Sequence, residues 1–308
     1  MSAFSPAKEN VTSRPQASAI LAVDSKDRLA VGATFPGSQQ PLSYNFRIQR
    51  TNSILNGFFN RIATTEIVLE WQAQNVSSAV SVPGFAVGNN VFTWSGGGSG
   101  TITIPTGWYT VAQLGAQLAT LMTAASVGGT TWTWAAIPAS AGILGAYWLL
   151  PAANVATLTL TGAIWAQLTG TGGFSGSANA YTTTLGLAVI NPDLRPVRYL
   201  DFVCSDLTYN QALKDDSTSS ISREILCRWY FAWADNAAPT VDANGYPILM
   251  GYTPFVARRL FSPPKQIRWD SRMPLGNLTF QVFNDSGTLA TVMGGTSQFL
   301  MTLLASEE

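Results

Sequence analysis

Residues 64–72 read TTEIVLEWQ, and this stretch decides the fold class of the chain. An apolar side alternates with a polar side along it: Ile67, Leu69 and Trp71 against Glu66, Glu70 and Gln72. A period of two residues is that of a β-strand with one buried face. The stretch therefore predicts a strand whose apolar side packs on a core while its polar side faces water.

Charge disappears where this strand ends. From Trp71 to Pro192, a run of 122 residues, there is no Asp, Glu, Lys, Arg or His. Charged side chains keep a surface hydrated and monomeric, so a run this long is either covered or exposes only neutral polar residues. Its most apolar window, 135–153, contains Pro138, Gly142 and Pro151. No uninterrupted span of about 18 to 20 apolar residues exists, so we expect no transmembrane helix.

The composition of the whole chain favours β-structure. Its 308 residues include 10 Trp, 15 Phe and 9 Tyr, which favour strands, and 27 Gly and 16 Pro, which favour turns. The net charge is zero, which gives no electrostatic reason to expect specific nucleic-acid binding. The absence of His removes the usual neutral-pH general base and the commonest metal ligand.

One helix and about a dozen short strands follow from the local patterns. Thr110 and Gln113 form a capping-box pattern before an apolar stripe at helical spacing: Val111, Leu114, Leu118, Leu121 and Met122. The remaining strand candidates share β-rich composition bounded by turn residues: 44–48, 91–94, 101–104, 130–137, 144–150, 156–160, 181–187, 197–204, 225–234, 266–270, 278–283 and 299–304. The segment 284–287, NDSG, predicts a hairpin turn.

These elements predict an all-β chain, a jelly-roll β-sandwich with an inserted uncharged strand/helix subdomain and an extended N-terminal arm. We expect the arm at 1–40, a single domain at 41–308, and the insertion at 95–190 with one amphipathic helix. The apolar island 19–23 within the arm is suited to pairing with a neighbour's sheet edge. Residues 1–10 lack a hydrophobic h-region, so no signal peptide is expected.

The sequence contains no group of residues that predicts catalysis. Cys204 and Cys227 lie in apolar strand-like sequence and are expected to be buried thiols. Without His, a hydrolase would need paired carboxylates, for which the candidates are Asp201 with Asp206 and Asp215 with Asp216. None of them lies in an aromatic-lined strand pattern. We expect no enzyme, and no catalytic, cofactor-binding or metal-binding residues.

Two clusters could bind a partner. Six tryptophans fall in the uncharged run: Trp94, Trp108, Trp132, Trp134, Trp148 and Trp165. They are expected to fill a core or a subunit interface, while stacking on sugars by Trp132 and Trp134 is the alternative. A basic cluster gathers around two aromatic residues, Phe261 and Trp269: Arg258, Arg259, Lys265, Arg268 and Arg272. Because Asp270 lies inside it, a solvated or inter-subunit ion-pairing face is expected rather than a nucleic-acid groove.

Four strings resemble one family. They are SAILAVDSKDR at 18–28, ILNGFFNRIATTEI at 54–67, TITIPTGWYT at 101–110, and PLGNLTF at 274–280 followed by DSG at 285–287. In this order they resemble jelly-roll capsid proteins of large eukaryotic DNA viruses, virophages and related polinton-like viruses. The charge-free length of 71–192 departs from the family pattern.

The resemblance implies a structural protein of an icosahedral virion, most like the penton that closes the five-fold vertices as a homopentamer, or a minor capsid protein. Its implied partners are identical subunits and neighbouring major capsid capsomers, with a vertex fibre or host receptor as a further option. The alternatives are a double-jelly-roll trimer at another lattice position and a carbohydrate-binding or sugar-hydrolysing sandwich. The implied location is the virion, after synthesis inside the host cell.

Overall fold

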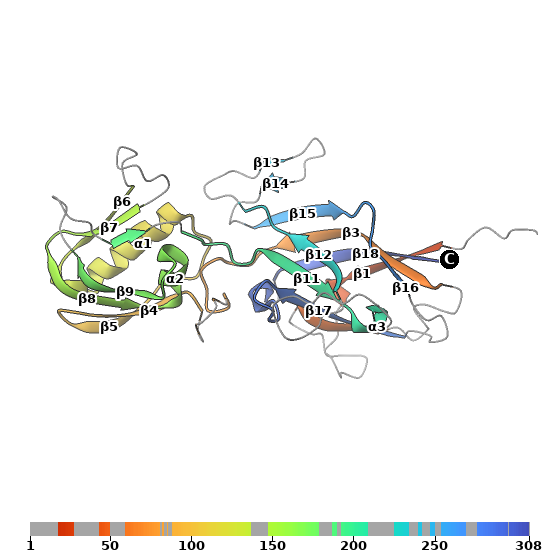
Figure 1. Cartoon of the computed structure of the whole chain (residues 1–308), viewed down its shortest axis with the longest axis horizontal. Coiled ribbons are helices and arrows are strands. Elements are labelled where there is room, and N and C mark those ends of the chain that lie inside the picture. Colours follow the sequence, from red (N-terminus) through yellow and green to blue (C-terminus); the bar gives the residue numbers. More distant parts are fainter. Residues whose placement is uncertain are drawn as a thin grey trace, which may run out of the picture.

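The structure is a computed structural model and describes residues 18–27, 43–49, 59–80, 82, 85, 88–136, 147–178, 187–189, 192–208, 225–233, 240–241, 247–249, 254–268, 276–294 and 296–307. It has two lobes, a β-sandwich body and an elongated insertion (Figure 1). No helix among these residues has the length and hydrophobicity needed to cross a membrane.

The body consists of eight main strands: β1 (Ser18–Asp24), β2 (Asn45–Gln49), β3 (Arg61–Trp71), β11 (Tyr199–Val203), β12 (Ile225–Tyr230), β15 (Phe255–Leu260), β17 (Asn277–Asn284) and β18 (Gln298–Ser306). Shorter elements accompany them: β16 (Gln266–Arg268), β13 (Thr240–Val241), β14 (Pro247–Leu249), α3 (Ser205–Thr208), η1 (Ser25–Asp27) and η4 (Thr291–Met293).

The pairing of these strands is that of a jelly roll. In chain order the first strand pairs with the eighth, the second with the seventh, the third with the sixth and the fourth with the fifth, all antiparallel. The eighth also pairs with the third and the seventh with the fourth, which gives the sheets β1-β18-β3-β15 and β12-β11-β17-β2. Short β16 also pairs with β3. Two sheets whose four main strands are connected in this order form a jelly-roll sandwich, so the predicted fold class is confirmed.

The first strand corrects part of the predicted N-terminal arm. Residues 18–24 form β1, which pairs with β18 of the same chain from Ser18↔Ser306 to Asp24↔Leu300. Val23 is buried in the core of the body and Leu21 packs against it. The apolar island therefore completes its own sheet instead of reaching a neighbour, because β18 offers it an antiparallel edge.

Alternation along β3 places its side chains as the sequence predicts. Ile67, Leu69 and Trp71 are fully buried, whereas Glu66 and Glu70 are only partly buried on the opposite face. Aromatic rings from both sheets meet in the same core: Phe46 stacks on Phe280 at 5.6 Å, and Phe202 contacts Phe299 edge to face at 4.9 Å. Such pairs add stability beyond the area that they bury.

The insertion leaves the body after β3 and returns to it before β11. It therefore starts earlier than the 95 expected from sequence. Its elements are β4 (Val91–Ser95), β5 (Ser99–Thr103), α1 (Val111–Ala124), η2 (Val127–Gly129), β6 (Trp132–Ala136), β7 (Tyr147–Pro151), β8 (Val155–Thr161), α2 (Ala163–Thr169), β9 (Gly173–Ala178) and β10 (Leu187–Val189). They form the sheets β5-β4-β8-β9 and β10-β7-β6 around a hydrophobic core of their own.

Helix α1 begins as predicted and packs on β6. The Thr110 hydroxyl accepts the N–H of Gln113, whose side chain accepts the N–H of Thr110, so the capping box is present. The second helix, α2, was not expected, because seven residues are too few to show a helical period. Gly170 ends α2 in the left-handed conformation with φ 74°.

Gly115 allows α1 to lie close against β6. A Cβ at this position would lie 2.0 Å from the Trp134 indole, which is stacked on Tyr147 at 5.1 Å and so has little freedom to move. Glycine costs a helix interior about 1 kcal/mol relative to alanine. The close packing of Trp134 offsets that cost.

We expect Gly115→Ala to lower the free energy of unfolding by about 1–3 kcal/mol, because overpacking outweighs the better helix propensity of alanine. Urea denaturation followed by tryptophan fluorescence measures the change. Ala116→Gly, at an exposed position of the same helix, is the control for propensity alone and should cost about 1 kcal/mol. A more stable Gly115→Ala variant would contradict this packing.

Candidate assembly surfaces and the joint between the lobes

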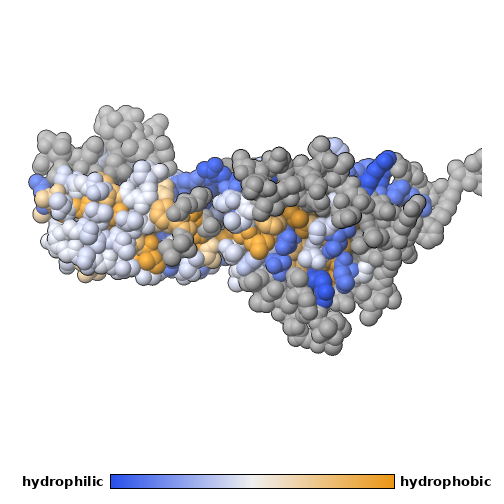
Figure 2. Space-filling model, turned by 60° about the horizontal axis from the view of Figure 1, so that its bottom comes forward, coloured by the Kyte–Doolittle hydropathy of each residue, from blue (hydrophilic) through white to orange (hydrophobic). Residues whose placement is uncertain are grey.

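The outer face of the sheet β5-β4-β8-β9 consists of small neutral side chains, here called the hydroxyl face. Its exposed residues form rows across the strands in register: Thr101, Thr93 and Thr161, then Ser99, Ser95, Thr159 and Ser175. Thr159 and Ser175 lie within 3.4 Å of each other through their hydroxyl oxygens. In Figure 2 the insertion is mostly pale, whereas deep blue gathers on the body and beside the joint.

The apolar side chains of the insertion face its own core. Phe92, Trp94, Ile102, Leu158 and Leu160 alternate with the hydroxyl face and are buried. Many apolar residues of the uncharged run are thus buried in the core of the insertion and need no partner to cover them. The exposed residues of this sheet are Ser, Thr and Gly, together with Ala156, and none of them carries a charge.

Most of the tryptophans belong to this core. Trp94, Trp132 and Trp165 are buried, and Trp134 packs against the same cluster. The prediction that they fill a core is confirmed for these residues. Trp108 is 38% exposed, and its Nε1 donates to the carbonyl of Ala73. Trp132 and Trp134 share a face of β6, but that face packs on α1 and forms no exposed platform for sugar rings.

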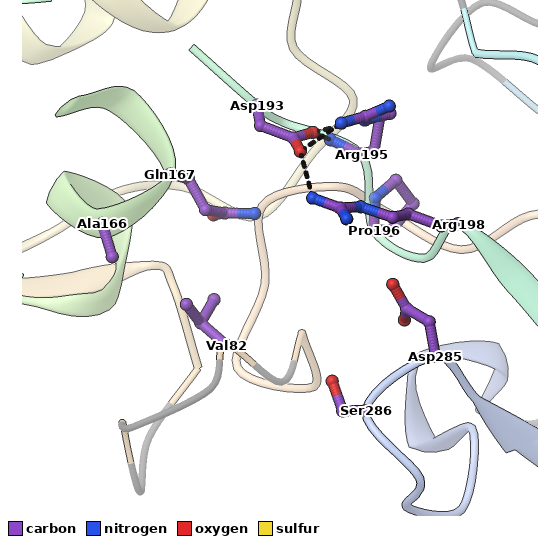
Figure 3. A pocket seen from close by; sticks show the side chains of 9 residues that line it. All are labelled: Val82, Ala166, Gln167, Asp193, Arg195, Pro196, Arg198, Asp285 and Ser286. Atoms are coloured by element: carbon purple, nitrogen blue, oxygen red, sulfur yellow. Dashed lines mark hydrogen bonds and ion pairs between the residues drawn. The ribbon is translucent and has the colours of Figure 1, made fainter. Parts of the chain in front are cut away.

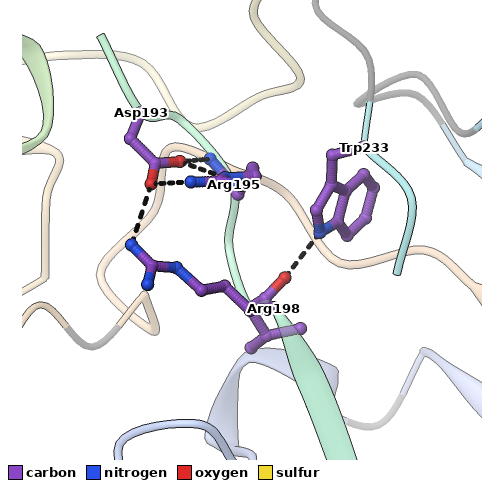
Figure 4. Close-up of polar contacts among 5 residues, drawn as sticks. Asp193, Arg195, Arg198 and Trp233 are labelled. Atoms are coloured by element: carbon purple, nitrogen blue, oxygen red, sulfur yellow. Dashed lines mark hydrogen bonds and ion pairs between the residues drawn. The ribbon is translucent and has the colours of Figure 1, made fainter. Parts of the chain in front are cut away.

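An aromatic cluster and α2 join the insertion to the body. Trp233 contacts the hydrophobic cores of both lobes, and it stacks on Phe231 at 4.9 Å and meets Trp71 at 5.9 Å. Its Nε1 donates to the carbonyl of Val197 at 2.5 Å, in the segment that returns from the insertion (Figure 4). Helix α2 also contributes to both cores, with Ala163 in one and Trp165 in the other.

A polar cleft of about 340 Å³ lies beside this joint. Four separate parts of the chain line it (Figure 3). They are Val82, then Ala166 and Gln167 of α2, then Asp193, Arg195, Pro196 and Arg198 of the returning segment, and finally Asp285 and Ser286 of the turn after β17. Asp193 holds the returning segment through a bidentate contact with Arg195, at 2.6 and 2.5 Å, and a longer one with Arg198 at 3.4 Å.

The two carboxyl groups in this cleft are shifted in opposite directions. Burial raises the pKa of Asp193, but hydrogen bonds from Arg195 and the charges of Arg195 and Arg198 outweigh it, so the pKa is lowered. Burial raises the pKa of Asp285. Hydrogen bonds from the backbone of Asp285 and Arg198, and the charge of Arg198, offset only part of that rise. The ionised Asp193 side chain therefore stabilises the folded state, whereas the ionised Asp285 side chain destabilises it.

The carboxylates considered for sugar hydrolysis have structural partners. Asp201 is fully buried and accepts two hydrogen bonds from Arg228, at 2.6 and 3.0 Å. The Arg228 guanidinium lies 4.2 Å from the centre of the Tyr199 ring. Asp206 accepts the N–H of Thr279 at 2.6 Å. Asp215 and Asp216 lie outside the described residues.

Both cysteines are free and buried, as predicted. Burial raises the pKa of the Cys227 thiol to about 12 and that of Cys204 still further. Thiolate is the reactive form, so neither thiol is suited to nucleophilic chemistry. Among the residues described, no group of three or more His, Cys, Asp or Glu could hold a metal ion.

The basic cluster divides between two faces of the body. Arg258 forms an ion pair with Glu66 on the outer face of the sheet. Arg259 and Lys265 instead line a second cleft with Arg228, between β12 and β15. Arg268 is exposed on β16, and Arg272 and Trp269 lie outside the described residues. Sequence reasoning placed these residues together, but not the strand pairing that separates them.

Comparisons with known proteins show a likeness of structure and none of sequence. No family model matches the sequence, and no curated protein matches it. Among solved structures, the chain is similar to the crystal structure of SeMet-labelled mavirus penton protein, with a TM-score of 0.45 and 10% sequence identity. The match covers 96% of this chain and 100% of that one. The jelly-roll assignment of the body rests on its own strand registers.

We expect Arg228→Leu to lower the free energy of unfolding by about 3 kcal/mol, because it leaves the buried Asp201 carboxylate without its charged partner. The double variant Asp201→Leu/Arg228→Leu should cost less than this single one, since no charge then remains buried. Urea denaturation of the wild type, both single variants and the double variant measures the coupling. Additive losses would show that the two side chains do not interact.

The Asp193 cluster predicts a defined pH dependence. Its lowered pKa stabilises the folded state above the unfolded pKa of about 3.9, and this contribution is lost as the pH falls below that value. Asp193→Asn should therefore cost about 0.5–1 kcal/mol at pH 7, a value limited by the partial exposure of the pair, and progressively less toward pH 3.

Asp285→Asn is the matched control and should change the stability in the opposite direction. Because the folded-state pKa of Asp285 is raised, its carboxylate lowers stability at neutral pH, and this penalty disappears as the pH falls through the folded and then the unfolded pKa. The variant should melt at a higher temperature than the wild type at pH 7 and converge with it in acid. Thermal melts from pH 3 to 7 test both, and parallel curves for all three proteins would contradict the assignment.

Proposed function

We propose that this protein is a structural, non-enzymatic subunit of an icosahedral virus capsid, and that it closes the five-fold vertices as a homopentameric penton. One observation carries the proposal: a jelly-roll body bears a large inserted lobe whose outer sheet presents hydroxyl groups and no charge. The resemblance of four sequence strings to jelly-roll capsid proteins supports the same role.

The energetics of association favour such a surface. Burying a charged side chain in an interface costs free energy unless the partner supplies a well-placed counter-charge. The hydroxyl groups of Thr and Ser and the methyl group of Thr are removed from water at a much lower cost. A neighbour can therefore cover the hydroxyl face without paired charges, in keeping with the depletion of charged residues at the cores of subunit interfaces.

A closed ring needs two different complementary faces on each subunit. The insertion offers two neutral ones made by different elements. The first is the hydroxyl face, and the second is the exposed side of α1, which carries Ala112, Gln113, Ala116 and Thr120. Contacts between unlike faces of this kind would close by rotation, and neither would require the desolvation of a charge.

Two other functions receive less support. A major capsid protein with two jelly rolls would need a second eight-stranded sandwich, and the strands described in the insertion make sheets of four and three around two helices. A carbohydrate-binding sandwich would need exposed indoles, and Trp132 and Trp134 are occupied in packing.

Neighbouring major capsid capsomers are proposed as further partners in the virion, and the insertion as the place for a fibre or host receptor.

Native mass spectrometry of the purified protein tests the assignment. A complex of five copies of the 32.9 kDa chain is expected, and negative-stain images should show five-fold rings. A trimer would reject the penton while leaving a capsid role open. A protein that stays monomeric at all concentrations would remove the assembly argument.

Charge introduced on the hydroxyl face should block assembly without unfolding the subunit. We expect Thr93→Lys/Thr159→Glu and, more strongly, Thr93→Lys/Thr159→Lys to shift the population from pentamer to monomer, because unpaired charges would have to be buried. Both positions are exposed, so the melting temperature of the monomer should change little. Thr93→Ser/Thr159→Ser is the control. Pentamers of unchanged stability in the lysine variants would exclude this face as an interface.

A further inference from the structure

Two strands, β12 and β15, end their sheets on the same side of the body. Within the described part of the chain, β12 pairs only with β11, and β15 only with β3. A strand at the end of a sheet presents unpaired N–H and C=O groups, which can accept an additional strand. Both sheets of the sandwich therefore offer an edge on this one side.

The hydrogen-bond alternation shows which groups of β15 face outward. The N–H of Phe261 donates to the carbonyl of Thr65 in β3 at 2.9 Å. In an antiparallel pair, successive residues direct their backbone groups alternately toward and away from the partner strand. The N–H and C=O groups of Val256 and Leu260 are therefore directed away from β3, toward the edge of the sheet.

Exposed apolar residues gather along the same side. Among the described residues six large hydrophobic side chains are exposed, and three of them are here: Tyr230 (56%), Val256 (60%) and Leu260 (62%). Val256 and Leu260 share the outer face of β15. Charged residues are the usual protection of an edge strand, yet only Arg258 stands between these two, and it is paired with Glu66.

The inner side of the same edge is cationic. A cleft of about 370 Å³ lies between β12 and β15 and is lined by Arg228, Arg259 and Lys265, with no Asp or Glu among the described lining residues. Asp201 forms an ion pair with Arg228. Arg259 lies 5.4 Å from the centre of the Phe261 ring, and Lys265 donates to the carbonyl of Ile225 at 2.9 Å.

We propose that this side binds an extended segment of a partner polypeptide, which adds as a strand to the open edge of β15. Alternate residues of a strand point to opposite faces. The segment would therefore place aliphatic side chains beside Val256 and Leu260, and carboxylates into the cleft at Arg259. Its chemistry is an alternation of acidic and aliphatic residues, and the proposal does not depend on the pentamer.

The arrangement favours an acidic peptide over a single-stranded nucleic acid. A phosphate backbone would need a row of cations along its path. Here Arg259 and Lys265 lie in one cleft, and the neighbouring outer face carries the carboxylates of Glu66 and Glu70 beside Arg258. A carboxylate on a short side chain reaches into the cleft while its backbone stays at the strand edge.

Fluorescence anisotropy with the full chain tests the proposal. The probe is a fluorescein-labelled peptide, Gly-(Val-Glu)3-Val-Gly, and the matched control peptide has Gln in place of every Glu. We expect the Glu peptide to bind at least about five-fold more tightly at low salt, with the difference reduced at 0.3 M NaCl. Equal affinity for the two peptides, no binding of the Glu peptide, or tighter binding of oligothymidylate would overturn the proposal.

Variants locate the site. Arg259→Gln should weaken binding of the Glu peptide about five-fold, and Val256→Pro should abolish it by removing an N–H of the open edge while sparing the bonds to β3. Arg47→Gln, on β2 at the opposite end of the second sheet, is the control and should bind normally. Equal losses in Arg259→Gln and Arg47→Gln would overturn the proposal.

Hydrogen exchange on the wild-type chain gives an independent measurement if a variant fails to fold. The bound Glu peptide should slow exchange at the amides of Val256 and Leu260. Unchanged exchange there would reject strand addition. Native mass spectra of the same samples record the oligomeric state, so failure of the peptide site and failure of the pentamer are distinguishable.

Discussion

The arrangement of the molecule depends on the position of β18 between β1 and β3. The last described strand pairs with the first along Ser18–Asp24 and with the third along Arg61–Glu70, so segments far apart in the sequence are joined in one sheet. A register shift by one residue would turn Phe299, Met301 and Leu303 from the core to solvent. Alternation on three adjacent strands thus fixes the sandwich, and the insertion is held at the end of β3, where the chain passes from one sheet to the other.

The insertion carries no charge, and charged residues reappear at the joint between the lobes. The first charged residue after the run is Asp193, and it contacts Arg195 and Arg198 at once. Trp233 secures the same segment from the other side through the carbonyl of Val197. The polar contacts that position the lobe therefore lie in the connection, and the lobe itself needs only its apolar core and a neutral surface.

Local patterns predicted those elements whose period extends over enough residues. The strand at β3, the capping box of α1, the turn at 284–287 and the buried thiols could all be read from neighbouring residues. The role of β1 could not, because its partner β18 lies at the other end of the chain. Strand β15 was missed because Arg258 and Arg259 face opposite sides of a sheet, which in sequence is only a basic pair. The cleft at the joint combines residues near 82, 166, 193 and 285, whose proximity follows from the topology alone.

The two kinds of surface on this molecule respond differently to the solution. Contacts on the hydroxyl face involve no charge, so salt would leave them largely unaffected or, by favouring burial, strengthen them. A contact at the β12/β15 side involves Arg259 and its neighbours and would weaken as salt screens their charge. In the proposed assembly these surfaces would act in two separate steps: neutral surfaces would hold identical copies together over a wide range of conditions, while the cationic edge would join a different partner under conditions that favour ion pairing. The division follows from where the sequence places its charges, which is on the jelly-roll body and at the joint, and nowhere between Trp71 and Pro192.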